Sequence, residues 1–385
     1  MGAIRRADRT CDGDGGGARV KVALAHDYAV NKGGAERVAL ALAGIWPGAP
    51  LFTALYRSDE TFPEFASLDV RTSRLQRFGG DFRRMLPVFG RAMRALAIDG
   101  YDMTISSSSG FAHHVRPSTG CHIVYCHTPP RFLWDARYKH ASVAPWWARP
   151  ALPLVLASLR RADKTAAARA HLYVANSART AARIAQVYRR RSVVIHPPVD
   201  VERFAIGPRT GDYHVMVGRL LPHRNMNLAI EAFTRMGRRL VVVGDGPMRA
   251  QFERAAGGTV EFRGAVDDDA LVRLYGECRG VVVPGEEDFG IVPLEANASG
   301  RPVIALGRGG ARETVRDGST GVLFAEETSD ALASAVERAE GIVFDPVALR
   351  AHADAYGSEA FAGRMRALAE NTLETCIECA RSRRP

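Results

Sequence analysis

Short apolar runs rich in valine, isoleucine and leucine recur along the chain, and most are separated by segments whose apolar residues repeat at helical spacing. Each run has the length and the β-branched composition of a buried strand in a parallel sheet. The runs lie at residues 20–25, 101–106, 122–126, 171–175 and 193–195 in the first half, and at 213–217, 240–243, 260–264, 281–283 and 302–305 in the second half. Strands that alternate with helices predict a doubly wound α/β fold.

The two sets of runs predict two Rossmann-like domains, because 385 residues are too many for one ordinary core. We expect an N-terminal domain at residues 19–200, a C-terminal domain at 205–345, and a helical closing segment with a tail at 346–385. The proline-rich stretch at 196–200 predicts a rigid exit from the first domain. Residues 1–18 are almost free of apolar side chains, which predicts a disordered tail.

An acidic stretch follows the run at 281–283. Glu286, Glu287 and Asp288 come after Pro284-Gly285, at the edge where open α/β sheets bind ligands. We expect Glu287 and a second carboxylate, Glu295, to face one crevice, where carboxylates accept the hydroxyl groups of a sugar.

The residues between these two glutamates predict the start of a helix. Phe289, Gly290 and Ile291 lead to Pro293, which suits a first helical turn. The free N–H groups and the positive dipole end of that helix favour an anion, most naturally a phosphate.

Three further loops carry candidate chemistry. Gly33 and Gly34 follow the first strand and let the backbone approach a ligand, although the loop lacks the GxGxxG pattern of dinucleotide-dependent dehydrogenases. Arg219 and Arg224 lie five positions apart on a loop between strand and helix, a spacing that suits the two phosphates of a diphosphate. His127 follows the run at 122–126, where a reacting group is expected.

The stretch from Glu287 to Ala305 resembles the signature of the retaining, nucleotide-sugar-dependent glycosyltransferases of family 4. That signature has two glutamates separated by seven residues, with Phe-Gly between them and a Pro-Val-Ile-Ala strand after. The Gly-Gly loop and the Pro-Val-Asp junction at 198–200 are similar to the family as well, whereas Arg224 stands where the family has a lysine. Residues 125–135, YCHTPPRFLWD, further resemble a mannosyltransferase-rich subgroup of surface polysaccharide assembly.

The resemblance implies a GT-B fold, in which two Rossmann-like domains face each other across a cleft and a C-terminal helix, here 361–373, returns to the first domain. It implies retaining transfer of a hexose, with mannose from GDP-mannose as the expected donor sugar, to a glycan or lipid-linked acceptor without metal or cofactor. Arg219 and Arg224 would hold the diphosphate, Glu287 the transferred sugar, Glu295 the ribose, and His127 the reaction centre. The implied donor site is completed by Gly33, Gly34, Phe289, Gly290 and Ile291.

The net charge of +10 fits nucleotide phosphates, an anionic membrane surface or nucleic acid. We expect no nucleic-acid partner, because no basic motif with interleaved aromatic residues occurs. Two segments that mix arginine with apolar side chains, 77–96 and 143–161, are candidates for an anionic membrane surface, the alternatives being a surface helix and domain core.

Six cysteines are few for this length and predict a reduced compartment. Cys376 and Cys379 form an isolated CxxC pair with no second ligand pair for a metal. We expect a cytoplasmic protein, with peripheral attachment to the inner face of the plasma membrane as an option.

Two other functions stay open at the level of sequence. A nucleotide-sugar epimerase of the same fold would exchange hydrogen between solvent and the sugar. A basic nucleic-acid-binding protein would bind unrelated DNA in a salt-dependent manner and would not act on sugar nucleotides.

Overall fold

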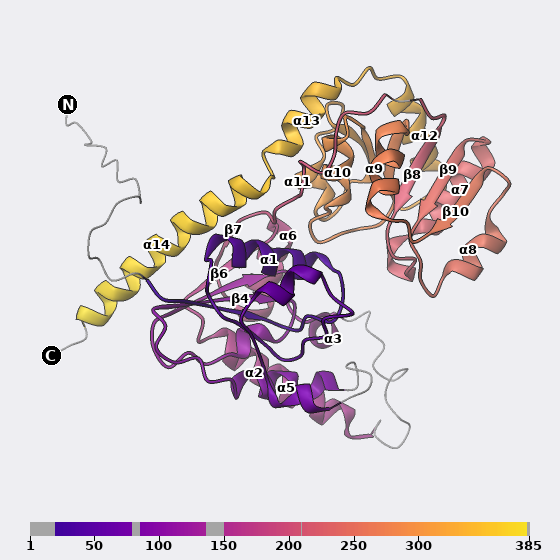
Figure 1. Cartoon of the computed structure of the whole chain (residues 1–385). Helices are drawn as coiled ribbons and strands as arrows, with labels where there is room; N and C mark the ends of the chain where they lie inside the picture. Colours follow the sequence, from indigo (N-terminus) through magenta and orange to yellow (C-terminus); the bar gives the residue numbers. More distant parts are fainter. Residues whose placement is uncertain (1–19, 79–84, 136–149, 209, 383–385) are drawn as a thin grey trace, which may run out of the picture.

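The computed structural model describes residues 20–78, 85–135, 150–208 and 210–382, and it contains two parallel β-sheets covered by helices (Figure 1). The first sheet has the strand order β3-β2-β1-β4-β5-β6-β7, and the second has the order β10-β9-β8-β11-β12-β13. Every pair of neighbouring strands is parallel. The predicted fold of two doubly wound, Rossmann-like domains is therefore confirmed.

The first sheet forms the N-terminal domain. Its strands are β1 (Val22–His26), β2 (Leu51–Thr53), β3 (Val70–Thr72), β4 (Met103–Ser108), β5 (Cys121–Cys126), β6 (Leu172–Ala175) and β7 (Ser192–Val194). Its helices are α1 (Gly34–Ile45), α2 (Leu86–Arg94), α3 (Arg131–Trp134), α5 (Leu152–Ala167) and α6 (Ala178–Tyr188), with short 3₁₀ turns at Pro63–Ser67, Arg74–Arg77 and Ala112–His114.

The second sheet forms the C-terminal domain. Its strands are β8 (Tyr213–Val217), β9 (Arg239–Val243), β10 (Val260–Gly264), β11 (Gly280–Val283), β12 (Val303–Leu306) and β13 (Gly321–Phe324). Its helices are α7 (Met226–Met236), α8 (Arg249–Ala255), α9 (Asp268–Glu277), α10 (Val292–Ala298), α11 (Ala311–Thr314), α12 (Ser329–Glu340) and α13 (Pro346–Asp354), with a 3₁₀ turn at Pro222–Arg224.

Continuous apolar strands form because both faces of each sheet are covered. In β5, Ile123 and Tyr125 belong to one core cluster, whereas Val124 and Cys126 belong to another on the opposite face. Successive side chains of a strand point to opposite faces, so a strand buried on both sides needs apolar residues at every position. This explains why the runs show no alternation with polar residues.

The C-terminal helix α14 (Ser358–Ser382) returns to the N-terminal domain, as the resemblance implied (Figure 1). Phe361, Met365 and Ala369, spaced four residues apart on one face of the helix, are buried in the same core cluster as Leu24 and Ile123. Helix α13 ends at Asp354 and α14 begins at Ser358. No helix in the described ranges is both long enough and apolar enough to cross a bilayer.

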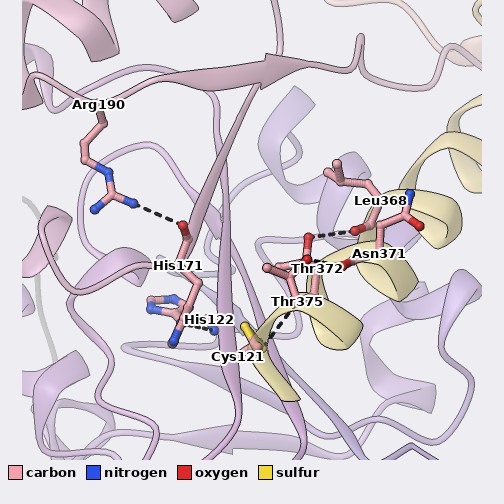
Figure 2. The surroundings of a disulfide bond; sticks show 9 residues. Cys121, His122, His171, Arg190, Leu368, Asn371, Thr372 and Thr375 are labelled. Atoms are coloured by element: carbon pink, nitrogen blue, oxygen red, sulfur yellow. Dashed lines mark hydrogen bonds between the residues drawn. A yellow bond between two sulfur atoms is a disulfide. The ribbon is translucent and has the colours of Figure 1, made fainter. Parts of the chain in front are cut away.

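A disulfide joins Cys121 of β5 to Cys376 of α14 (Figure 2). Thr372, one turn before Cys376, donates a hydrogen bond from its hydroxyl to the Leu368 carbonyl oxygen at 2.7 Å. The expectation that the cysteines are reduced, drawn from their low number, is thus not met for this pair. The return of α14 brings the two thiols together across 255 positions of sequence, a proximity that residue spacing does not reveal.

Each sheet has a switch point where the strand order reverses, between β1 and β4 in the first and between β8 and β11 in the second. Ligands of open α/β sheets bind at the carboxyl ends of the strands beside such a point. The loops that leave β1, β4, β8 and β11 are therefore the segments from which the functional site is built.

Candidate active site

A cavity of about 410 Å³ lies between the two domains and is lined by residues of both. The N-terminal domain contributes residues from the loops after β1, β4 and β5, and the C-terminal domain contributes the loops after β8 and β11. We call this space the interdomain cavity. It is where two facing switch points are expected to hold a shared ligand.

The loop after β11 places Glu287 in the interdomain cavity, where it forms an ion pair with Arg224. Gly309 lies beside this loop in a parallel bridge, and a Cβ on Gly309 would meet the Glu287 carbonyl oxygen at 2.2 Å. The close approach therefore requires glycine at position 309. Burial and the charge of Arg131, which also lines the cavity, lower the pKa of Arg224.

Phe289, Gly290 and Ile291 complete the turn from β11 into α10, and all three line the interdomain cavity. Gly290 adopts a φ of 87°, a left-handed conformation that favours glycine. The Phe289 ring is buried and stacks on His196 at 5.2 Å between ring centroids, which fixes the loop against the interdomain linker.

Glu286 and Asp288 point to the other domain. Glu286 forms an ion pair with Arg179 of α6, and Asp288 forms one with Arg131 of α3. Arg183 lies 3.7 Å from Asp288. Two of the three carboxylates in the acidic stretch are thus engaged by arginines across the domain boundary, and Glu287 alone is paired within its own domain.

His127 lines the interdomain cavity from the end of β5. Its Nε2 atom lies 2.9 Å from the Ser107 hydroxyl, which also lies 3.2 Å from Nδ1 of His26. Burial, reinforced by the charge of His26, lowers the pKa of His127 to about 3. The imidazole is therefore neutral at physiological pH and offers a hydrogen-bonding group rather than a positive charge.

The Gly33-Gly34 loop starts α1 on the opposite wall. Gly34 lines the interdomain cavity, and a Cβ on it would meet Ile291 of the C-terminal domain at 3.5 Å. Gly33 is the N-cap residue of α1 and lies next to the Glu36 carboxylate. Gly34 therefore lies where the backbone of one domain faces the loop after β11 of the other, whereas Gly33 contacts only its own domain and does not line the cavity.

Besides Gly33, the expected site residues Arg219 and Glu295 lie outside the interdomain cavity. Arg219 is exposed on the loop after β8 and does not line the interdomain cavity. Glu295 does not line it either: its carboxylate accepts a hydrogen bond of 3.1 Å from the Tyr275 hydroxyl, and burial raises its pKa. The single crevice expected for Glu287 and Glu295 is thus not formed, because α10 turns Glu295 toward α9.

Sequence reasoning missed residues whose side chains connect segments that are distant in sequence. Asp27, at the end of β1, is buried and accepts backbone hydrogen bonds from Ser109 at 2.5 Å, Phe111 at 2.8 Å and Ala112 at 2.5 Å. It thereby fixes the loop after β4. Its position directly after a buried strand was the only signal in the sequence.

Within the described ranges, one group of side chains has the composition of a metal site, namely His113, His114 and Asp163. Its members already satisfy one another, since His113 and His114 lie 2.9 Å and 3.4 Å from one Asp163 oxygen. The other oxygen accepts a hydrogen bond of 2.7 Å from the Trp134 indole. The group is a buried carboxylate with its donors and lies outside the interdomain cavity.

Both domains match models of known protein families. The family model described as Glycosyltransferase Family 4 matches residues 32–203, and the model described as Glycosyl transferases group 1 matches residues 211–340. A D-inositol 3-phosphate glycosyltransferase of Geodermatophilus obscurus is 33% identical over 195 residues, which are 42% of this chain and 43% of that protein.

A second relative is the GDP-mannose-dependent alpha-(1-6)-phosphatidylinositol monomannoside mannosyltransferase of Mycolicibacterium smegmatis, 31% identical over 217 residues. That match covers 48% of this chain and 56% of the relative. The matched segments therefore span about half the length of these relatives.

Solved structures agree on the fold. Sucrose-phosphate synthase from Thermosynechococcus elongatus superposes with a TM-score of 0.69 at 20% identity, covering 93% of this chain and all of that one. HepE of Anabaena, in complex with UDP and glucose, gives a TM-score of 0.68 at 18% identity over 91% of this chain and 99% of that one. With both domains matched in order and the fold shared, the chain belongs to the family 4 glycosyltransferases of the GT-B fold.

Proposed function

We propose that this protein transfers a hexose, with retention of anomeric configuration, from a nucleotide diphosphate sugar to a glycan or lipid-linked acceptor. The observation that carries the proposal is the convergence of Glu287, Arg224 and His127 on one cavity built from both domains. A carboxylate for sugar hydroxyls, a guanidinium for phosphate and a neutral imidazole are three groups that such a donor needs.

Phosphate binding falls to Arg224 and, from the other domain, to Arg131. Both line the interdomain cavity, and both are paired with carboxylates in the structure. An incoming diphosphate replaces those carboxylates as the partner of the two arginines. The arginines then stabilise the negative charge that develops on the diphosphate as it leaves. Arg219 is close enough in sequence to join through movement of its exposed loop.

Glu287, once released from Arg224, accepts hydrogen bonds from hydroxyl groups of the transferred sugar. His127 lies at the reaction centre as a neutral hydrogen-bonding group. Glu295 is assigned to the ribose by family resemblance, with Tyr275 holding its carboxylate.

Retention is proposed from the resemblance of the Glu287 to Ala305 signature to retaining enzymes, and the distribution of carboxylates around the cavity supports it. Among the described residues that line the cavity, Glu286, Glu287 and Asp288 all lie on one loop of the C-terminal domain, and the N-terminal wall contributes none. A general base opposite the leaving group is therefore lacking on that wall. The acceptor hydroxyl attacks the anomeric carbon on the face that the diphosphate leaves, and its proton passes to the leaving phosphate oxygen.

We assign the chemistry to the protein and the substrate, without a metal or an organic cofactor. Mannose is proposed as the sugar on the resemblance of residues 125–135 and on a relative whose name states GDP-mannose dependence. Attachment to the inner face of the plasma membrane is proposed from the arginine-rich segments at 77–96 and 143–161, parts of which lie outside the described residues.

The test is transfer with purified protein, a panel of nucleotide sugars and membrane-extracted acceptors. We expect transfer from GDP-mannose in preference to UDP-glucose, UDP-galactose and UDP-N-acetylglucosamine, with an α-linked product by proton NMR. An inverted linkage would overturn the mechanism, whereas retention with another donor would overturn only the sugar. Solvent hydrogen exchange into the sugar without transfer would indicate the epimerase instead.

A further inference from the structure

Two histidines share one buried serine hydroxyl behind the N-terminal wall of the interdomain cavity. The Ser107 hydroxyl, near the end of β4, lies 2.9 Å from Nε2 of His127 and 3.2 Å from Nδ1 of His26. His26 is the last residue of β1 and is 1% exposed. The strands β1, β4 and β5 are neighbours in the sheet, so the backbone holds the three side chains next to one another.

A carbonyl oxygen sets the direction of these hydrogen bonds. Nδ1 of His26 also lies 3.3 Å from the Ser107 carbonyl oxygen, which can only accept a hydrogen bond. Nδ1 is therefore a ring nitrogen of His26 that carries a proton. A positively charged imidazole donates from Nδ1 as well, so the direction does not depend on the charge of His26.

The reverse direction is disfavoured. It would place the only ring proton of His26 on Nε2, and the Nδ1 lone pair would face the lone pairs of the Ser107 carbonyl oxygen. Nε2 of His26 is buried without a hydrogen-bond partner among the described residues, so it is unsatisfied in both directions. Only the reverse direction also sets two acceptors against each other at 3.3 Å.

The position of the proton on His127 follows from this direction. Ser107 accepts a hydrogen bond from His26, so its own hydroxyl proton is directed to Nε2 of His127. Burial and the charge of His26 lower the pKa of His127 to about 3, so the imidazole of His127 carries one proton at neutral pH. Because Nε2 accepts a hydrogen bond, that proton lies on Nδ1.

Nδ1 of His127 is open to the interdomain cavity. The residue is partly exposed and lines the cavity, while its Nε2 atom is turned inward to Ser107. No described residue forms a hydrogen bond with Nδ1, and the atom is not buried. His127 thus offers the cavity an N–H group, which binds an oxygen lone pair, and offers no basic nitrogen to an acceptor hydroxyl.

We propose that Ser107 and His26 are positioning residues for the transfer reaction, because they hold the proton of His127 on Nδ1. His127 then meets the bound donor as an N–H group that binds an oxygen atom of the donor, and not as a base. This inference rests on the proposed function. It adds two residues to the site that act through His127 and do not themselves line the interdomain cavity.

The first experiment locates the proton by nitrogen NMR of the full chain labelled with isotopic histidine, in the absence of donor. His127→Asn assigns the His127 signals. We expect a protonated Nδ1 and an unprotonated Nε2 for His127 in the wild type at pH 7. In Ser107→Ala nothing donates to Nε2, so a population with the proton on Nε2 should appear. A proton on Nε2 of His127 in the wild type, or an unchanged His127 spectrum in Ser107→Ala, would overturn the proposal.

The second experiment compares turnover in Ser107→Ala with a matched control. Ser106, the preceding residue of β4, points to the opposite face of the sheet, and its hydroxyl lies 2.8 Å from Nε2 of the buried His122. Ser106→Ala therefore removes the same kind of hydrogen bond without touching His127. We expect Ser107→Ala to lower kcat by about threefold to tenfold, the effect of one hydrogen bond, with little change in KM. Ser106→Ala should leave kcat and the His127 signals unchanged.

Asparagine and glutamine at position 127 distinguish an N–H group at Nδ1 from a merely structural ring. The amide nitrogen of asparagine can occupy the place of Nδ1, whereas that of glutamine occupies the place of Nε2. His127→Asn should therefore keep several times more turnover than His127→Gln. No advantage of His127→Asn, or an equal loss of kcat in Ser106→Ala and Ser107→Ala, would overturn the proposal. Absence of transfer by the wild type, together with the expected His127 spectrum, would count against the proposed function, whereas the control of the His127 proton by Ser107 would stand.

Discussion

Arginines line two separate cavities of this protein, and in the two cavities they have different partners. In the interdomain cavity Arg224 pairs with Glu287 and Arg131 pairs with Asp288. The second cavity, of about 310 Å³, lies between α2 and α5 of the N-terminal domain. Arg91 and Arg94 line it together with Asp163, and neither arginine forms an ion pair with a described residue. Paired arginines are held in position by the protein before a ligand arrives, whereas unpaired ones lack a counter-charge.

This difference predicts different consequences of mutation. Removing one member of a partly buried ion pair removes a contact to the ligand. It also leaves the charge of the other member without a counter-charge, which disturbs the site. Removing an unpaired arginine relieves repulsion, so it should not destabilise the protein. The following variants test the paired side of the comparison.

The largest effect is expected for Glu287→Ala. The change removes the carboxylate that meets the transferred sugar and leaves Arg224 without its partner, so transfer should fall by about 100-fold to 1,000-fold. The melting temperature should stay close to that of the wild type, because Glu287 lies on a loop at the cavity. Glu261→Ala, which removes an exposed glutamate paired with Arg263, is the control. Near-normal turnover in folded Glu287→Ala protein would remove Glu287 from the site.

Arg224→Ala should come second and separates the two candidate phosphate ligands. Because Arg224 lines the interdomain cavity and Arg219 does not, the Arg224 variant should weaken donor binding by roughly 10-fold to 100-fold. Arg219→Ala should have a smaller effect. Calorimetry with the nucleotide diphosphate sugar measures both, and a larger loss in the Arg219 variant would show that its loop closes over the donor.

Low pH should reduce the stability of the N-terminal domain, because it contains buried histidines that are neutral in the folded protein. The folded pKa of His127 is about 3, below the ordinary value of 6.5, so the unfolded chain takes up a proton first as the pH falls. Stability is therefore lost progressively below about pH 6.5, by on the order of 2 kcal/mol at pH 5 for one such histidine. His122, with a pKa lowered by burial to about 3, should behave alike.

Thermal unfolding of wild type, His127→Gln and His122→Gln between pH 7 and pH 5 checks this effect. Each glutamine variant should lose less stability than the wild type over that range. Parallel curves for all three proteins would mean that the histidines are not held neutral by burial.

The smallest effect is expected for Asp288→Asn, which breaks the ion pair with Arg131 and weakens the contacts to Arg179 and Arg183. Such pairs at a partly exposed boundary contribute little each, so the KM for donor should change severalfold at most. Small-angle scattering should show a larger maximum dimension if the pair helps to hold the domains together. An unchanged dimension with an unchanged KM would assign these contacts no role in closure.

Sequence reasoning predicted the strands because a strand buried on both faces of a sheet is apolar at every position, a pattern that is visible in a short stretch of sequence. The return helix was predicted from the family resemblance. The runs at 122–126 and 281–283 correspond to β5 and β11. The Cys121–Cys376 disulfide has no local sequence pattern that predicts it, since its formation depends on where α14 lies in space.

The candidate site was predictable where position in the fold determines it. His127 and Glu287 follow strands, and both line the interdomain cavity. Glu295 was expected to share a crevice with Glu287, but the orientation of α10, which spacing along the chain does not determine, turns its carboxylate to Tyr275. The arginines at Asp288 were missed because their contacts cross between domains that are far apart in sequence.

The most direct test of the central claim is the affinity of the wild type and of Arg224→Ala for a panel of nucleotide diphosphate sugars. A ligand present at about 100 times its Kd should stabilise the wild type by about 2.7 kcal/mol. We predict that GDP-mannose stabilises the wild type most and that the stabilisation is largely lost in Arg224→Ala. Stabilisation by no nucleotide sugar, or stabilisation that is equal in both proteins, would contradict a donor site in the interdomain cavity.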